Sequence, residues 1–393
     1  MSVTAAAGFR AAGVAAGLKA DAKDVALVVN DGPLHHASAV FTTNTVAAAP
    51  VLWSRQVISD GRADAVVLNS GGANACTGAP GFADTHTTAE EVAEKLTASG
   101  RDVSATDVLV CSTGLIGERL DMPALLSGVE GAVQGLSAEQ HAAADAAEAI
   151  RTTDTVSKTE TRSGSGFTVG GMAKGAGMLA PGMATMLAVV TTDAVISQED
   201  LDAALREAVR ISFNRADSDG CMSTNDTVIA LASGANSESD PSGVDLPEFQ
   251  VTLNEVCSSL AAQLIADAEG AHHEIAIRTV GALTEEQAEE AGRAVARSNL
   301  FKTAIFGRDP NWGRILSAVG TTDVDFDPTT IDVAVNGVWI CRGGGIGEDR
   351  DLVDLSGRDV EVVIDLKAGE TEATILTNDL THDYVHENSA YSS

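Results

Sequence analysis

One threonine in this sequence has the surroundings of a self-activating nucleophile. Residues 177–187 carry two glycines, a proline and a single hydroxyl side chain, that of Thr185, which directly follows Ala184. If the chain cut itself between these two residues, Thr185 would gain a free α-amine, whose unperturbed pKa of about 7.7–8.0 leaves a useful fraction unprotonated near neutral pH. That amine can take the hydroxyl proton, so one residue would supply both nucleophile and base. The alternative is a flexible glycine-rich turn before a strand at 186–192, and the local sequence alone favours it.

Two polar, glycine-bearing turns each follow a predicted strand. Residues 69–78 follow a strand at 65–69, and residues 111–117 follow a strand at 108–112. Backbone N–H groups exposed at such turns can form an oxyanion hole, in which the loss of one donor costs about 2.7–4 kcal/mol of transition-state stabilisation. Two purely structural turns explain the pattern equally well.

Charged residues near these segments also have two interpretations. Lys174 lies among small residues ahead of Thr185, where it would bind a substrate carboxylate or lower the pKa of a nearby amine, although a lone lysine is usually a solvated surface charge. Asp267 and Glu269 close a predicted helix, and two carboxylates at this unfavourable end of the helix dipole suggest a cationic partner. An exposed acidic helix end is the default interpretation of that pair.

Other common catalytic and binding groups find less support. Cys76 or Cys111 would need a neighbouring histidine to act as a thiol nucleophile, and the sequence places none. The adjacent pairs His35-His36 and His272-His273 lack the spacing of a shared metal face, so we expect surface residues and no metal site. Neither a P-loop nor a G-x-G-x-x-G fingerprint is present.

Composition narrows the class of protein. The 393 residues suggest two to three domains, and 44% hydrophobic with 21% charged residues is typical of a soluble globular chain. The net charge of -31 disfavours nucleic-acid binding, and no run of 18 apolar residues predicts a membrane span. Five cysteines without a C-x-x-C pair, and a start without a leucine-rich signal region, indicate a reducing cytoplasm.

Short Val, Leu and Ile runs alternate with longer Ala- and Glu-rich segments, which predicts a mixed α/β fold with buried strands. We expect strands at 25–29, 65–69, 108–112, 186–192, 228–232, 274–280, 331–335 and 360–365. We expect helices at 87–99, 138–150, 197–211, 256–268 and 284–296.

Taken together, a series of ordered motifs resembles the ornithine acetyltransferase family, the glutamate N-acetyltransferases of arginine biosynthesis. The match extends from Gly8-Phe9-Arg10-Ala11-Ala12-Gly13 to the end of the sequence. Its further motifs are residues 69–78, Ser112-Thr113-Gly114, Thr152-Thr153-Asp154, Gly171-Met172-Ala173-Lys174-Gly175, Met183-Ala184-Thr185-Met186-Leu187, Ser223-Thr224-Asn225-Asp226-Thr227, residues 309–314 and Glu387-Asn388-Ser389-Ala390-Tyr391.

This resemblance implies a precursor that cuts itself between Ala184 and Thr185 into an α chain, 1–184, and a β chain, 185–393. The implied fold is a layered α-β-β-α sandwich shared by the two fragments, with a C-terminal α/β portion. The fragments would assemble into a heterotetramer or larger particle in the cytoplasm.

The implied reaction moves an acetyl group from N-acetylornithine to glutamate by a ping-pong cycle through acetyl-Thr185, with no cofactor. Some relatives also accept acetyl-CoA. By the same resemblance, Thr113 and Gly114 are the oxyanion donors. The substrate-binding positions that it implies are Thr153, Lys174, Thr185, Glu269, Asn388 and Ser393. A carboxylate at Glu269 suits an ornithine ammonium, and Lys174 suits a substrate carboxylate.

Two other kinds of protein stay open at this stage. An N-terminal-nucleophile amidase or aminopeptidase would use the same self-cleavage but pass the acyl group to water. A scaffold or binding protein would keep one intact chain, in which Thr185 never becomes a terminus.

Overall fold

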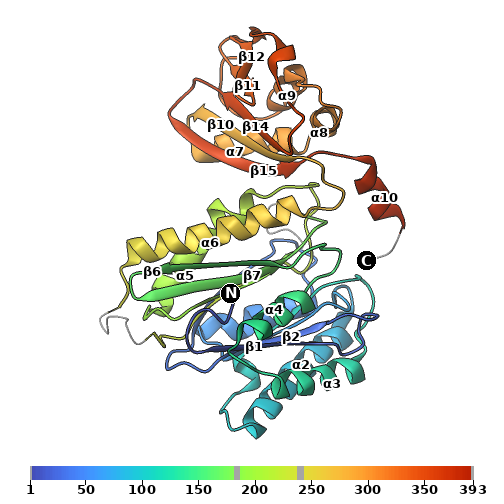
Figure 1. Cartoon of the computed structure of the whole chain (residues 1–393), viewed down its shortest axis with the longest axis vertical. Coiled ribbons are helices and arrows are strands. Elements are labelled where there is room, and N and C mark those ends of the chain that lie inside the picture. The colour runs from blue at the N-terminus through green and yellow to red at the C-terminus, as the bar shows by residue number, and fades with distance from the viewer. Residues whose placement is uncertain (1, 181–185, 237–242, 391–393) are drawn as a thin grey trace.

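The structure is a computed structural model that describes residues 2–180, 186–236 and 243–390. Within these ranges the chain combines three β-sheets with α-helices (Figure 1), so the predicted mixed α/β class is confirmed. Ala184, Thr185 and Ser393, which carry three of the sequence predictions, lie outside the described residues.

The first sheet has four strands in the order β1-β2-β4-β5, and its last pair is parallel. Every residue of β2, β4 and β5 is buried, which is why these strands are continuous apolar runs in the sequence. The four strands are β1 (Phe9–Val14), β2 (Val25–Asn30), β4 (Ala65–Asn69) and β5 (Val108–Ser112).

The second sheet has five strands in the order β3-β9-β8-β7-β6. Strands β8 and β9 are parallel, so both begin at the same edge of the sheet, and the end of antiparallel β7 lies beside the start of β8. The strands are β3 (His36–Phe41), β6 (Lys158–Gly164), β7 (Phe167–Lys174), β8 (Leu187–Thr192) and β9 (Thr227–Ala232).

The two faces of the five-stranded sheet belong to different cores. Leu187 and Val189 pack in one core with strands of the first sheet, whereas Ala188 and Val190 pack in a second core with α5 and α6. This period of two is that of a strand buried on both faces. In Figure 1, α6 therefore lies above the five-stranded sheet, the four-stranded sheet lies below it, and α2 and α3 cover the lowest face.

Six helices belong to this two-sheet region. The helix predicted at 197–211 is one of them, and its first residue is the capping residue: the Ser197 hydroxyl accepts from Asp200 N. The six helices are α1 (Ala49–Val57), α2 (Gly78–Ala98), α3 (Met122–Gln134), α4 (Gln140–Ala149), α5 (Gln198–Ile211) and α6 (Leu246–Ala266).

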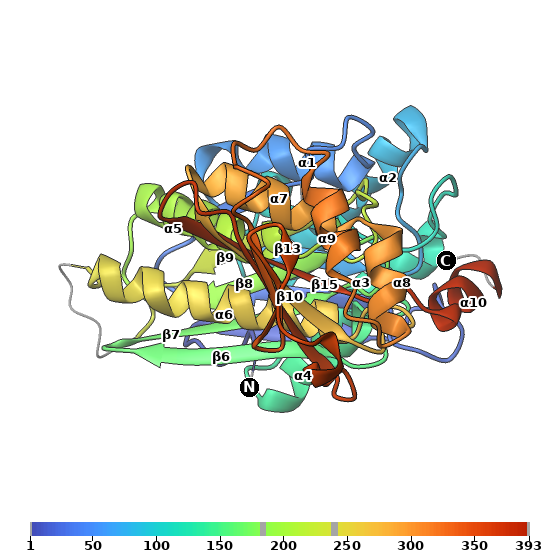
Figure 2. The ribbon, with the colours of Figure 1, turned by 90° about the horizontal axis from the view of Figure 1, so that it is seen from above.

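A six-stranded sheet in the order β13-β12-β11-β14-β10-β15 forms a C-terminal unit with its own apolar core. From above, this unit lies over the middle of the layers, and α10 stands at the side of the molecule (Figure 2). The elements are β10 (Glu274–Ala282), α7 (Glu285–Ala296), α8 (Asn299–Phe306), α9 (Trp312–Val319), β11 (Asp332–Val335), β12 (Val338–Arg342), β13 (Gly345–Ile346), β14 (Asp359–Asp365), β15 (Thr371–Asn378) and α10 (His382–Ala390).

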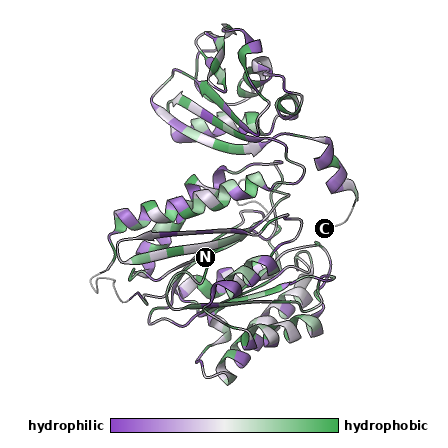
Figure 3. Cartoon of the chain, in the orientation of Figure 1, coloured by the Kyte–Doolittle hydropathy of each residue, from purple (hydrophilic) through white to green (hydrophobic). Residues whose placement is uncertain are grey.

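Helix α10 differs from the other helices because none of its residues is buried. It is mostly hydrophilic in Figure 3, whereas strands in the layers are mostly hydrophobic. In the part of the chain that the structure covers, we find no helix with both the length and the apolar character needed to cross a bilayer.

Candidate active site

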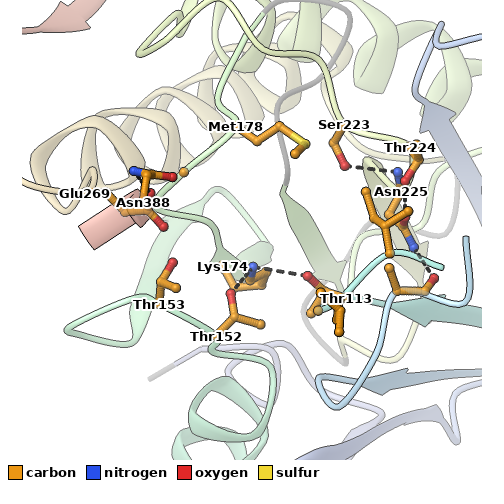
Figure 4. Close-up of a pocket in the computed structure, with 15 residues that line it drawn as sticks. Thr113, Thr152, Thr153, Lys174, Met178, Ser223, Thr224, Asn225, Glu269 and Asn388 are labelled. Carbon is orange, nitrogen blue, oxygen red and sulfur yellow. Dashed lines mark hydrogen bonds between the residues drawn. The ribbon is translucent and has the colours of Figure 1, made fainter. Parts of the chain in front are cut away.

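A cavity of about 190 Å³ lies where β4, β5 and β7 end and β8 and β9 begin (Figure 4). It is smaller than the roughly 300–1,000 Å³ of typical drug-sized pockets, which suits a molecule the size of an amino acid. All the predicted site residues that the structure describes line this cavity: Thr113, Gly114, Thr153, Lys174, Glu269 and Asn388. The other lining residues are Ala73, Leu115, Ile116, Thr152, Gly177, Met178, Ser223, Thr224 and Asn225.

The two glycine-bearing turns form one wall. Gly72 N donates to Thr113 O at 3.0 Å and Ala73 N donates to Leu115 O at 3.0 Å, so the turns stay hydrogen-bonded beyond the ends of β4 and β5. The two turns are therefore structural, and they also border the cavity.

The backbone N–H of Gly114 is directed away from the hydrogen bond between the two turns. Because Thr113 C=O accepts from Gly72, the N–H of the same trans peptide, that of Gly114, points the opposite way. This N–H donates to none of the described residues. A side chain at Gly114 would meet Gly72 N at 2.9 Å, and its φ of 125° is open to glycine alone, so the turn requires this residue.

Lys174 is buried at the centre of the site, so its default interpretation as a solvated surface charge is wrong. Its Nζ donates to Thr113 Oγ1 at 3.2 Å and to Thr152 Oγ1 at 2.6 Å. Burial lowers the pKa of this ammonium, and the Asp154 carboxylate opposes that effect. Because Thr113 Oγ1 accepts from Lys174, its own hydrogen remains available to be donated.

Asp154 fixes this lysine from behind the cavity. Its carboxylate accepts from Lys158 Nζ and Gly175 N, both at 2.6 Å, and lies 3.9 Å from Lys174 Nζ. Burial acts to raise the pKa of Asp154, but the ammonium groups of Lys174 and Lys158 outweigh it and hold that pKa below its ordinary value. The site therefore contains a buried, ionised carboxylate shared by two lysines.

The two carboxylates at the end of α6 have different surroundings. Asp267 forms an ion pair within the chain, because its Oδ2 lies 2.5 Å from Lys158 Nζ. Glu269 instead lines the cavity and accepts from Asn388 Nδ2 at 2.8 Å. A side chain on Gly177 would lie 2.4 Å from the Glu269 carboxylate, so glycine permits their close approach.

Helix α10 brings Asn388 to the cavity from the far side of the C-terminal unit. Three polar contacts attach the start of the helix to the rest of the chain: Thr381 Oγ1 to Gly270 O at 2.6 Å, His272 Nε2 with Asp383 Oδ2 at 2.7 Å, and Tyr384 Oη to Asp219 Oδ2 at 3.5 Å. The His382 ring also packs edge-on against Phe306, with ring centroids 5.6 Å apart, so this wall of the cavity is attached by a few polar and ring contacts and α10 has no buried residue.

Comparison with known proteins identifies the family. The ArgJ family model matches residues 10–393. The chain belongs to the ArgJ family. The arginine biosynthesis bifunctional protein ArgJ of Thermobifida fusca is 60% identical and that of Streptomyces avermitilis 61% identical, each over 394 residues that cover 100% of both chains. A solved ornithine acetyltransferase from Mycobacterium tuberculosis, complexed with ornithine, is 56% identical and covers 47% of this chain and 96% of its own, at a TM-score of 0.46.

The predicted resemblance is thus confirmed, and this ArgJ-family chain is an acyltransferase of arginine biosynthesis. Of the two cysteines considered as nucleophiles, Cys111 is placed unfavourably for that role. Cys111 lies buried in β5, where burial raises its pKa to about 12, so it stays a neutral thiol near pH 7. The expectation that the paired histidines lie at the surface is wrong for His273, which is buried with its Nδ1 2.7 Å from Asp379 Oδ2.

Several cavity residues of this ArgJ-family chain were not singled out for a role from the sequence. Thr224 and Asn225 precede β9, and the neighbouring Asp226 accepts from Met186 N at 3.1 Å. Burial raises the pKa of Asp226 well above its ordinary value. The sequence signal that could have identified these residues is the polar run directly before the buried strand β9. The two glycine-bearing turns had already suggested that polar residues at the ends of strands form the site.

Proposed function

We propose that this protein transfers the acetyl group of N-acetylornithine to glutamate through an acetyl ester on Thr185. One observation carries the proposal: six residues predicted from the resemblance, spread between positions 113 and 388, line a single amino-acid-sized cavity. That cavity contains both a lysine and a glutamate, as the binding of amino acids with charged side chains requires.

The nucleophile is freed by self-cleavage. The Thr185 oxygen attacks the Ala184 carbonyl carbon, the bond to the Thr185 nitrogen breaks, and water opens the resulting ester. Two contacts next to this segment support the assignment: Leu187 pairs with Lys174 across β7 and β8, and Met186 N donates to Asp226. The chain on the C-terminal side of Thr185 is thereby held beside a residue that lines the cavity.

The two fragments, 1–184 and 185–393, are parts of one folded body. Strand β7 belongs to the first fragment and its neighbour β8 to the second, so a cut between them separates adjacent strands rather than domains. The stacked sheets with outer helices agree with the family's α-β-β-α sandwich. We propose the heterotetramer or larger assembly on the resemblance alone.

In the first half-reaction, the Thr185 oxygen attacks the acetyl carbonyl carbon while its proton passes to the Thr185 α-amine. The Gly114 N–H and the Thr113 hydroxyl stabilise the negative charge that develops on the carbonyl oxygen. The bond from the acetyl carbon to the ornithine nitrogen then breaks, and that nitrogen takes the proton back from the α-amine. Ornithine leaves, and the acetyl ester remains on Thr185.

In the second half-reaction, the neutral α-amine of glutamate attacks the ester carbonyl carbon. The bond to the Thr185 oxygen breaks, and the proton lost by the glutamate nitrogen returns to that oxygen through the Thr185 α-amine. The products are N-acetylglutamate and the starting enzyme. No oxidant, reductant or cofactor takes part in this balance.

The charged lining residues bind the two substrates. Glu269 meets the side-chain ammonium of ornithine, and Lys174 meets a carboxylate of either substrate. Thr153 and Asn388 complete the substrate contacts, with Ser393 at the chain terminus. The five cysteines are free thiols, which supports a reducing compartment, and we place the enzyme in the cytoplasm.

Transfer of a labelled acetyl group tests the proposal. The enzyme is incubated with N-acetylornithine labelled in its acetyl carbon, together with unlabelled glutamate, and the products are separated by mass. We expect the label in N-acetylglutamate. Labelled acetate alone would instead favour an amidase. In a separate incubation of glutamate with labelled acetyl-CoA, labelled N-acetylglutamate would show that acetyl-CoA is a second acetyl donor.

A further inference from the structure

Asn225 connects the two glycine-bearing turns that border the cavity. Its Nδ2 donates to Ala73 O at 2.6 Å and to Ser112 O at 2.8 Å. Its Oδ1 accepts from Thr224 Oγ1 at 2.6 Å. The side chain is 4% exposed, so both hydrogen bonds to the carbonyl oxygens are shielded from water.

These contacts use the whole donor capacity of the amide. A carboxamide carries two N–H hydrogens, and here each goes to a backbone carbonyl. Asn225 has no donor left for a substrate or an oxyanion, although it lines the cavity. Any effect of Asn225 on the reaction must therefore pass through the turns that it holds.

The peptide planes on either side of Thr113 show how this effect arises. Asn225 binds Ser112 C=O, and Thr113 N, the other end of that peptide, donates to Asn69 O at 2.9 Å. The next peptide is held through Thr113 C=O by Gly72, which leaves Gly114 N–H directed away from Gly72. Two consecutive peptides are thus fixed, and between them stands the Thr113 side chain.

We propose that Asn225 is a positioning residue that sets the two oxyanion donors, the Thr113 hydroxyl and the Gly114 N–H. This inference rests on the proposed function. Asn225 belongs to the fragment 185–393, and its acceptors Ala73 and Ser112 belong to 1–184. The fragment that supplies the nucleophile therefore also fixes the donors supplied by the other fragment.

The test measures the rate at which Thr185 becomes acetylated in a single turnover. The variants Asn225→Ala and Asn225→Asp are mixed rapidly with N-acetylornithine, and the reactions are quenched and analysed by mass spectrometry. The amount of acetylated fragment is divided by the total amount of fragment 185–393, so that incomplete self-cleavage does not affect the rate. We expect acetylation at saturating substrate to slow by about 10–100-fold, as small misplacements of catalytic groups do, while the half-saturating substrate concentration changes by less than about threefold.

Asn30→Asp is the matched control. Asn30 is also buried and its Nδ2 also donates to two backbone carbonyls, Leu34 O at 3.0 Å and Ala232 O at 3.3 Å, but it does not line the cavity. We expect its acetylation rate to equal that of the wild type. Thr224→Val is a milder second variant, since it removes only the hydroxyl that orients the amide, and we expect a smaller slowing.

A double variant separates positioning from general loosening of the fold. If Asn225 acts through Thr113, then Asn225→Ala slows a Thr113→Ala enzyme less than it slows the wild type. Full additivity, or slowing of less than about twofold in both Asn225 variants, would overturn the positioning role while acetylation of the wild type upholds the proposed function. A wild-type enzyme that gains no acetyl group would overturn both.

Discussion

The two sides of the cavity are built in opposite ways. On one side, Thr113, Lys174 and Asn225 are buried and joined to backbone and side-chain partners from several strands. On the other side, Glu269 is also buried, but its partner Asn388 lies on the exposed helix α10. We call the first the buried wall and the second the helix wall.

This difference matches what the proposed ping-pong cycle needs. The same developing charge has to be stabilised in both half-reactions, so its donors gain from being fixed in advance. Two amino acids of different side-chain charge must enter and leave the same cavity, and a wall supported by few contacts can adjust to each. Changes to the buried wall should therefore lower kcat or stability, and changes to the helix wall should raise KM.

The largest effect is expected for Asp154→Asn in the buried wall. Loss of this carboxylate leaves the buried Lys174 without its carboxylate partner, while Lys158 keeps Asp267, and breaking a buried ion pair in this way costs about 3–5 kcal/mol of unfolding free energy. Urea unfolding in an uncut Thr185→Ala background measures it within a single chain. The surface pair control, Asp145→Asn beside Lys23, should cost no more than about 1 kcal/mol.

The unfolding free energies of the wild type and Asp154→Asn should also differ in their dependence on pH. Burial opposes the ionised form, but Lys174 and Lys158 prevail and the pKa of Asp154 is lower in the folded than in the unfolded state. Its stabilisation is therefore complete above the unfolded value of about 3.9 and declines as the pH falls below it. The gap in unfolding free energy between wild type and Asp154→Asn should narrow below about pH 4. A gap that widened there would contradict this assignment.

Thr113→Ala should come next, with kcat reduced by about 10–1,000-fold through loss of one oxyanion donor. KM for N-acetylornithine should change little, because the donor acts on charge that develops in the transition state. Thr252→Ala removes another buried threonine hydroxyl, one that bonds only within α6, and should leave kcat unchanged. A Thr113→Ala enzyme slowed by less than about twofold would remove this hydroxyl from the oxyanion hole.

Glu269→Gln tests the helix wall. A hydrogen bond to a charged group contributes about 1.5–3 kcal/mol, so KM for N-acetylornithine should rise by about 10–100-fold while kcat falls by less than about threefold. Glutamate carries no side-chain ammonium, so its KM should rise less. Equal effects on both substrates would mean that Glu269 does not meet the ornithine ammonium.

The smallest effect is expected for Asn388→Ala. This change removes the 2.8 Å hydrogen bond that orients Glu269 but keeps the carboxylate that meets the ornithine ammonium, so only part of the contribution of Glu269 is lost. KM for N-acetylornithine should rise by about two- to tenfold, with kcat retained. A large fall in kcat instead would place α10 in the chemical step and remove the distinction between the walls.

The central strands could be predicted from the sequence because burial on both faces leaves a continuous apolar run, as in β4 and β5. Strand β6 was missed because it is an edge strand with charged, half-exposed residues such as Glu160 and Arg162. Helix α6 begins at Leu246, well before the predicted residue 256. Asp245, which caps that start by accepting from Glu248 N, was the overlooked signal.

The site could be predicted only in part for a related reason. The residues alone suggested turns at strand ends. They did not show that Lys174 is buried, because the partners that compensate its buried ammonium, Asp154 and Thr152, come close to it only in the fold. The polar run before β9 could have marked Asn225 as a candidate, but its acceptor Ser112 lies 113 positions away, so the local sequence could not show which groups it binds. The helix-end pattern marked Glu269 together with Asp267, and the resemblance, rather than spacing, chose Glu269 and supplied Asn388.

Denaturing mass spectrometry of the purified protein, before and after a brief pulse of N-acetylornithine, tests the central claim most directly. We predict two fragments divided between Ala184 and Thr185, with one acetyl group added to the fragment that begins at Thr185. Thr185→Ala should stay uncut and gain nothing, and Thr185→Ser should retain part of both reactions. A single wild-type chain of unchanged mass, or a cut and fully active Thr185→Ala protein, would contradict the account.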